Sequence, residues 1–251
     1  MCLGLKCHAA CGGNYLRNTG GTSLLEVTTQ PKGFVFRTGT NSDHEVCTVA
    51  LWASAHKIPW RFQGLSDPLP DPNWVPVGTV DFVERHLGRG VPPDYFPSFL
   101  SSWVKRRVWT TDKWPYGERV FIKPADRHKR FTGFITKGGW KGKKRGSYVC
   151  SEIVRFTNEW RYYVANGKLV TARWYWGDDV NTPPAPSIDV EWPADWCGTA
   201  DFGTYEDGTI ALVEANSPFS TGWYGSQLEG EPYVGWLLSG WDWLRNKSYH
   251  T

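Results

Sequence analysis

Two carboxylates and one amide are expected to converge in the C-terminal part of this 251-residue chain. Asp201 lies on a strand predicted over residues 199–204, and Glu214 ends the next strand, predicted over residues 209–214. Asn216 follows Glu214 by two residues and therefore shares its strand face. Proteins hold Mg²⁺ through one or two carboxylates together with substrate phosphates. The sequence thus predicts a magnesium site at Asp201, Glu214 and Asn216.

A lysine stands at the end of a short apolar strand in the middle of the chain. Val120, Phe121 and Ile122 precede Lys123, and Pro124 stops the strand. Because an ammonium group cannot stay in an apolar core, it must emerge at the strand end and meet an anion or water. The pattern fits a phosphate ligand, and an exposed strand-end lysine is the alternative explanation.

A carboxylate and a guanidinium are predicted on one face of another strand. The segment Ser151–Val154 is followed by Glu159 and Arg161, which are two residues apart. Side chains at that spacing project from the same side of a strand, so these two can bind each other or a shared ligand. A plain surface ion pair would also explain them.

In this order, the three groups of residues resemble the motifs of the ATP-grasp superfamily, over roughly residues 107–225. The resemblance implies that the strand-end lysine contacts the nucleotide phosphates and that the segment 151–154 receives adenine. It also implies that Glu159, seven residues after Glu152, binds the ribose hydroxyls. The nucleotide-binding set is then Lys123, Lys137, Glu152, Ile153, Val154 and Glu159, and the metal set is Asp201, Glu214 and Asn216.

Further stretches are similar to a compact ATP-grasp clade found in bacteria and their viruses, namely residues 77–83, 92–97, 131–134 and 218–225. Membership of this family implies a ligase that uses ATP and Mg²⁺. The enzyme would activate a carboxylate as an acylphosphate for attack by an amine or a similar nucleophile, with small molecules or peptides as substrates. The alternative is a non-catalytic nucleotide- or nucleic-acid-binding module on the same fold.

The region that covers the phosphates in typical members is unusually basic here. Lys129 is predicted to act at the reaction centre and Lys137 to bind phosphate. The segment Lys141–Arg145 is interpreted as a solvated loop, because glycines lie among its charges. A further alternative is a loop that grips an anionic polymer or an acidic peptide.

Two arginines are predicted at the reaction centre, Arg161 and Arg173. Their strands flank Asn166-Gly167, which is typical of a tight type I′ hairpin turn. Counting outward from this turn does not pair the two arginines directly, but it can leave both on the cleft side of the sheet. The bidentate fork of Arg161 suits a phosphoryl group or a substrate carboxylate. A structural Arg–Glu ion pair is the competing interpretation.

The elements that position these residues predict an α+β fold of ATP-grasp type. Residues 1–33 have no hydrophobic periodicity and are interpreted as a flexible, dispensable extension. Residues 34–106 begin with a β-α-β pattern and predict a small α/β lobe with a parallel strand pair. Residues 107–251 predict antiparallel sheets that carry the nucleotide and metal sites, with a cleft between lobes.

Composition narrows the classes of function. The net charge of +3 creates no overall field that would favour nucleic acid or an anionic membrane, and no apolar stretch is long enough to span a bilayer. The last three of the six cysteines lie in segments that look buried, which favours a reducing cytoplasm. The 16 tryptophans are interpreted mainly as core, because most fall inside periodic apolar patterns. Residues 34–106 contain no motif that identifies a substrate.

Overall fold

A computed structural model describes residues 31–40, 43–68, 71–127, 130–137, 146–177, 182–219 and 221–247 of the chain. It contains one three-stranded parallel sheet and two four-stranded antiparallel sheets. The predicted α+β class is therefore confirmed. Most of the predicted extension, residues 1–30, lies outside the described part.

The N-terminal unit is the predicted β-α-β arrangement with one further strand and helix. Its sheet has the order β2-β1-β3, and β1 is parallel to both neighbours. The apolar side chains of β1 are fully buried, as expected for the central strand of a covered parallel sheet. The elements are β1 (Gly33–Arg37), α1 (His44–Ala55), β2 (Trp60–Gln63), β3 (Trp74–Val77) and α2 (Val80–Leu87).

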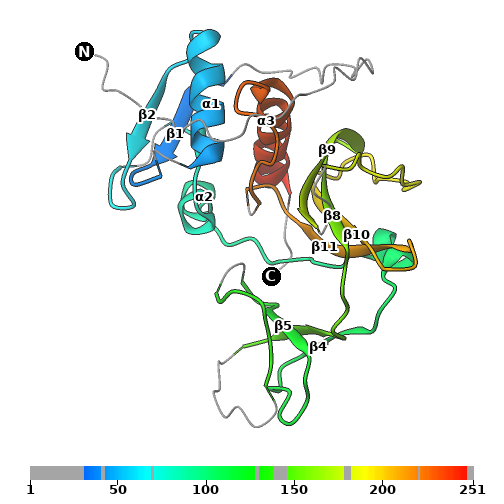
Figure 1. Ribbon diagram of the computed structural model, residues 1–251. Coiled ribbons are helices and arrows are strands. Elements are labelled where there is room, and N and C mark those ends of the chain that lie inside the picture. Colours follow the sequence, from blue (N-terminus) through cyan, green and yellow to red (C-terminus); the bar gives the residue numbers. More distant parts are fainter. Residues whose placement is uncertain are drawn as a thin grey trace.

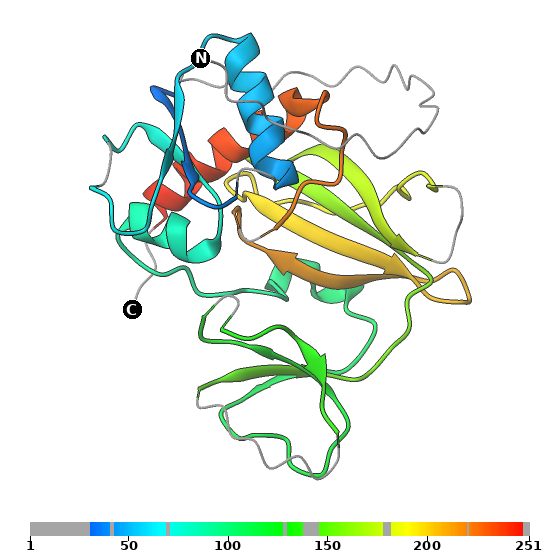
Figure 2. The same cartoon turned by 60° about the vertical axis from the view of Figure 1, so that its left-hand side comes forward.

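A first antiparallel sheet follows, after a short 3₁₀ helix, η1 (Ser98–Trp103), where the sequence predicted a helix. The sheet has the order β4-β7-β5-β6 and occupies the lowest part of Figure 1 and Figure 2, apart from the helices. Its last strand ends at Ser151, so that Glu152–Phe156 forms an extended connection to the next sheet. The strands are β4 (Val108–Thr111), β5 (Phe121–Pro124), β6 (Phe134–Ile135) and β7 (Tyr148–Ser151).

The second antiparallel sheet has the order β11-β10-β8-β9. The predicted turn is present: Asn166 and Gly167 have φ values of 50° and 69°, as a type I′ turn requires. The strands are β8 (Asn158–Ala165), β9 (Lys168–Gly177), β10 (Gly198–Thr204) and β11 (Ile210–Asn216).

The pairing of β8 with β9 differs from the count outward from the turn. A register shift between Tyr163 and Val164 displaces the ladder, so that Arg161 and Arg173 are direct partners. The prediction that they are not directly paired was therefore wrong. A β-bulge places two residues of one strand opposite one of the other, and a count that assumes a regular ladder misses it.

The C-terminal helix α3 (Gly230–Asn246) joins the N-terminal unit to this sheet. It packs against α1, β8 and β9, and Figure 1 shows it between them. One face of α3 is apolar and buried, including Trp236 and Trp241. The fully buried Trp236 belongs to the largest hydrophobic cluster, together with side chains of β1, α1 and β8. This cluster fixes the N-terminal unit against the sheet that carries the predicted metal residues.

Two further sequence expectations concern cysteines and membranes. Cys47, Cys150 and Cys197 are buried free thiols, whereas the cysteines of the first 30 residues lie outside the described part. Within the described ranges, no helix combines the length and apolar character that a membrane span requires.

Candidate functional site

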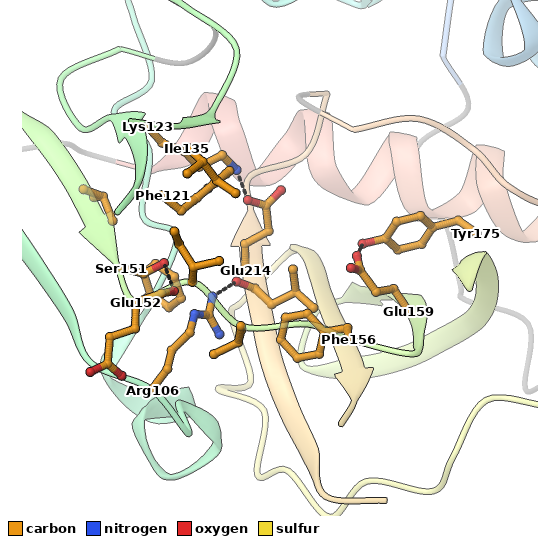
Figure 3. Close-up of a pocket in the computed structure, with 15 residues that line it drawn as sticks. Arg106, Phe121, Lys123, Ile135, Ser151, Glu152, Phe156, Glu159, Tyr175 and Glu214 are labelled. Atoms are coloured by element: carbon orange, nitrogen blue, oxygen red, sulfur yellow. Dashed lines mark hydrogen bonds and ion pairs between the residues drawn. The ribbon is translucent and has the colours of Figure 1, made fainter. Parts of the chain in front are cut away.

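A cavity of about 330 Å³ opens between the two antiparallel sheets (Figure 3). One wall is formed by β5, β6, β7 and the connection after β7, and the other by β8, β9 and β11. The lining combines apolar side chains with a few charged ones, which is typical of a small-molecule site. The residues are Phe96, Arg106, Phe121, Lys123, Ile135, Val149, Ser151, Glu152, Ile153, Val154, Phe156, Glu159, Tyr175, Val213 and Glu214.

Lys123 lies at the boundary between the two walls. Its ammonium group forms an ion pair with Glu214 of the opposite sheet (Figure 3). The Nζ atom also lies 4.4 Å from the ring centroid of Tyr95. Burial lowers the pKa of Lys123 to about 8, although the Asp201 carboxylate acts in the opposite direction. The strand-end lysine therefore faces the cavity as a partly desolvated cation rather than standing in bulk solvent.

The three predicted metal residues are neighbours at the end of the β10–β11 hairpin. Asp201 and Glu214 are direct register partners. The Asn216 amide nitrogen donates to Glu214 Oε1 over 3.1 Å, so both side chains emerge on the same face of β11. Of the three, Glu214 lines the cavity. The hairpin thus brings two carboxylates and an amide together, as the sequence suggested.

Asp201 has a second partner that the sequence did not indicate. Arg161 Nε and Nη2 donate to the two oxygens of Asp201, over 2.8 and 2.7 Å. The side chains are 8% and 1% exposed, so this bidentate pair is buried. Burial alone would lower the pKa of Arg161, but the Asp201 carboxylate raises it well above the ordinary value. The ion partner of Arg161 is thus an aspartate on the adjacent strand rather than a glutamate on its own strand.

Arg173 lies beside Arg161 but has different contacts. Its Nη2 donates to Glu229 over 3.3 Å, and its guanidinium carbon lies 5.6 Å from the ring centroid of Trp223. The Nε atom is buried and has no hydrogen-bond partner within the described ranges. Neither Arg161 nor Arg173 lines the large cavity.

Tyr175 connects Glu159 to the same cluster. Its hydroxyl donates to Glu159 Oε2 and lies 3.4 Å from Asp201 Oδ2 (Figure 3). Burial raises the pKa of Glu159, and the hydrogen bond from Tyr175 acts against that rise. The Arg161 guanidinium carbon lies 5.4 Å from the Tyr175 ring centroid. Glu159 and Arg161 therefore meet the same tyrosine, from the floor of the cavity and from beside it.

The predicted adenine segment lines the cavity, but one of its side chains points elsewhere. The carboxylate of Glu152 is exposed and accepts from the backbone nitrogen of Arg107 over 2.9 Å (Figure 3). Ser151 Oγ donates to the Glu152 carbonyl oxygen over 3.0 Å. Glu152 can therefore serve a ligand in the cavity through its backbone, beside Ile153 and Val154, while its carboxylate anchors the start of β4.

The basic region is only partly described. Lys129 and the segment Lys141–Arg145 lie outside the described residues. Lys137 is exposed after β6 and is not among the residues that line the cavity. The neighbouring Arg130 pairs with Asp126, its Nε lying 3.1 Å from the carboxylate. The predicted roles of Lys129 and Lys137 stay predictions.

Arg106 is a cavity residue that sequence reasoning missed. Its guanidinium donates to the carbonyl oxygens of Leu212 and Val213, over 2.6 and 2.7 Å. It also packs over the rings of Phe96 and Phe156, at 5.4 and 5.7 Å. These contacts fix the backbone of β11 immediately before Glu214. No local pattern marks Arg106, since its partners lie more than a hundred residues further along the chain.

A family model described as an ATP-grasp domain, family 2 of its clade, matches residues 99–230. This range includes every residue that lines the cavity apart from Phe96. It also includes Asp201 and Asn216. A search of curated proteins finds no significant match.

Solved structures with a similar course of the chain include three with ATP-grasp or ligase titles. D-cycloserine synthetase DcsG is 12% identical, with 81% of this chain and 98% of that chain covered and a TM-score of 0.49. A RimK domain protein ATP-grasp from Sphaerobacter thermophilus is 10% identical, with 85% and 99% covered and a TM-score of 0.42. D-alanine–D-alanine ligase from Bacillus anthracis complexed with ATP is 9% identical, with 84% and 97% covered and a TM-score of 0.44. At such identities and scores, these likenesses say nothing about the substrates of this chain.

Proposed function

Because the chain belongs to a family of ATP-grasp domains, we propose that it is an ATP-dependent carboxylate–amine ligase. The observation that carries this proposal is the cavity between the two antiparallel sheets. It has an apolar part beside the connection 151–154 and a charged end formed by Lys123 and Glu214. An adenine ring and a polyphosphate have the same division between apolar and charged parts.

In this proposal the nucleotide lies along the cavity. The backbone of Glu152, Ile153 and Val154 receives adenine between apolar walls, and Glu159 receives the ribose hydroxyls. Lys123 exchanges its ion pair with Glu214 for one with the phosphates, because three or four phosphate charges outweigh one carboxylate. That exchange frees the carboxylate of Glu214 for a cation.

The oxygen atoms at the charged end fit Mg²⁺. Glu214 and Asn216 present a carboxylate and an amide on one face, and Asp201 stands directly across from Glu214 with both oxygens on Arg161. Within the described ranges, no cluster of three or more His, Cys, Asp and Glu side chains could hold a metal by itself. A site that shares its ion with phosphate oxygens needs only one or two protein carboxylates. Bound Mg²⁺ would neutralise charge on those oxygens.

The reaction then follows in two displacements. A carboxylate oxygen of one substrate attacks the γ-phosphorus, the bond to the bridging oxygen breaks, and ADP leaves. The amine of the second substrate attacks the acyl carbon, phosphate leaves with the C–O bonding electrons, and the nitrogen releases a proton. Lys123 stabilises charge on the phosphoryl oxygens, and Arg161 and Arg173 lie where they could orient the carboxylate.

The direct test is to incubate the full chain with ATP, Mg²⁺ and pools of amino acids or short peptides. We expect release of ADP that depends on the pool, together with condensed products in mass spectrometry. Free phosphate should accumulate in step with ADP, because the acylphosphate passes it to solution. Binding of ATP without ADP release in any pool would favour the non-catalytic module instead.

The lowered pKa of Lys123 predicts how ATP affinity depends on pH. With a pKa of about 8, the ammonium form falls from roughly nine-tenths at about pH 7 to roughly one-tenth at about pH 9. Since the charged form attracts phosphate, affinity should drop by roughly tenfold as pH rises over this range. Isothermal titration at the two pH values measures it. Equal affinities would show that the charge of Lys123 does not support binding.

The proposed partners are small-molecule or peptide carboxylates and amines. A cytoplasmic location, inferred from cysteine usage, stays a prediction.

A further inference from the structure

A second cavity, of about 170 Å³, lies outside the proposed nucleotide site. It is formed by the start of α1, the turn between β3 and α2, the segment that follows β11, and α3. This volume corresponds to roughly five or six water molecules, or to an organic molecule of about six non-hydrogen atoms. The lining residues are Asp43, Glu45, Val46, Val77, Gly78, Thr79, Phe219, Thr221, Gly222, Tyr233 and Leu237.

Two carboxylates face this cavity. Asp43 precedes α1, and its side chain makes no capping hydrogen bond to the helix. Glu45 Oε1 accepts from the backbone nitrogen of Trp223 over 2.9 Å. Burial raises the pKa of Asp43, and the charge of Glu45 adds to the rise while Arg37 opposes it. The guanidinium of Arg37 itself donates to Thr79 Oγ1 over 2.5 Å. The cavity, called the acidic cavity below, is therefore an enclosure that a cation would stabilise.

A buried hydroxyl provides a second, independent sign of a ligand. Thr221 lines the acidic cavity together with the two carboxylates. Its Oγ1 atom is buried and has no hydrogen-bond partner within the described ranges. Buried polar atoms are rarely left without a partner, because the unmade hydrogen bond costs free energy. A polar molecule in the cavity would satisfy this hydroxyl.

The acidic cavity is linked to the proposed reaction centre through Gly222. The Gly222 carbonyl oxygen accepts from Arg161 Nη1 over 3.3 Å and from the Tyr163 hydroxyl over 2.7 Å. Arg161 in turn holds Asp201, the partner of Glu214 in the ladder. A ligand in the cavity thus lies one residue away from the arginine that the proposed mechanism assigns to a carboxylate.

We propose that the acidic cavity binds the ammonium group of a small amino acid whose carboxylate the enzyme activates. This inference rests on the proposed ligase function. Asp43 and Glu45 recognise the ammonium group, and the cavity volume restricts the side chain to a size near that of alanine. Two carboxylates also hold a bound amine in its protonated form, and an ammonium group has no lone pair for attack on an acyl carbon. The amine held here is therefore a recognition group and not the nucleophile.

The test compares alanine with lactate, which has the same size and carboxylate but a hydroxyl in place of the ammonium group. Ligand-observed saturation-transfer NMR titrations with the full chain measure both, using either enantiomer. We expect alanine to bind and lactate to bind at least about tenfold more weakly, since a hydrogen-bonded charge is lost. Failure of both alanine enantiomers to bind, or equal binding of lactate, would overturn the proposal.

Two charge-removing variants locate the contact. Asp43→Asn retains a good residue for the start of a helix, and Glu45→Gln retains an acceptor for the Trp223 nitrogen. The double variant should weaken alanine binding by roughly 10- to 150-fold. The control Glu206→Gln removes one charge from an exposed Arg155–Glu206 pair on the β10–β11 turn and should change nothing. Unchanged alanine binding in a folded double variant would overturn the assignment.

Titration with Mg-ATP on the same samples separates this inference from the ligase proposal. The double variant should bind Mg-ATP like the unaltered chain, because neither carboxylate lines the nucleotide cavity. If alanine binds but Mg-ATP does not, the ligase proposal fails while the ammonium site stands. If Mg-ATP binds but alanine does not, the ammonium site fails alone.

Discussion

Replacing Arg161 by alanine should lower the free energy of unfolding by about 3–5 kcal/mol, as measured by urea denaturation of the full chain. The guanidinium makes both hydrogen bonds of a bidentate pair with Asp201, whose side chain is only 1% exposed. Its removal leaves a buried carboxylate without a counterion. Arg161→Lys should cost less, because it keeps the charge but replaces two aligned donors by a single point charge.

A double-mutant cycle provides the control for this prediction. The variant Arg161→Ala with Asp201→Ala removes both charges, so part of the loss caused by the single change should be recovered. We expect a coupling energy of roughly 1–3 kcal/mol between the two sites. Simple additivity of the two single changes would show that the pair is not the source of the stability. Turnover cannot replace this readout, because both residues are also assigned to the reaction centre.

Lys123→Met should reduce ATP-dependent turnover by roughly 100- to 1,000-fold, the effect expected when one fixed donor to developing charge is lost. Methionine has a similar length and suits the apolar neighbours of β5, so the strand should keep its pairing with β7. Single-turnover measurement of ADP release, once a substrate pool is identified, would show the loss in the chemical step.

Lys168→Met is the matched control for Lys123→Met. Lys168 is exposed at the start of β9 and does not line the nucleotide cavity. It undergoes the same chemical change, so its turnover should stay at the original level. Equal turnover in the two variants would remove Lys123 from the phosphate site. Lys137→Met belongs beside them as a test of the predicted contribution of Lys137, which is exposed in the structure.

Local sequence chemistry predicted much of the fold. The Asn166-Gly167 turn identified the β8–β9 hairpin, because two consecutive residues that tolerate positive φ are needed there. The apolar run of β1 and the pattern after it identified the parallel N-terminal unit. The pairing of Asp201 with Glu214 followed from a single hairpin, in which sequence distance fixes spatial neighbours.

Non-local contacts could not be predicted in this way. The register shift near Tyr163 depends on how β8 and β9 twist together, and it alone makes Arg161 and Arg173 direct partners. The Arg161–Asp201 pair crosses between strands that are 40 residues apart in the sequence. Arg106 and Tyr175 carry no motif of their own, and their contacts to β11 and Glu159 arise only when the sheets are assembled.

The acidic cavity illustrates the same limit. Asp43 and Glu45 look like ordinary residues at the start of a helix, where negative charge interacts favourably with the helix dipole. Only the position of the segment after β11 encloses them with Thr221. Sequence reasoning found no substrate motif in the N-terminal unit because half of the cavity comes from the other end of the chain.

Isothermal titration of the full chain with ATP, with and without Mg²⁺, tests the central claim most directly. The claim is that the cavity between the two antiparallel sheets holds Mg-ATP at Lys123 and Glu214. We expect saturable binding of one nucleotide per chain that weakens strongly when Mg²⁺ is chelated, and that weakens again in Lys123→Met. A folded sample that shows no affinity for ATP in the presence of Mg²⁺ would contradict the account.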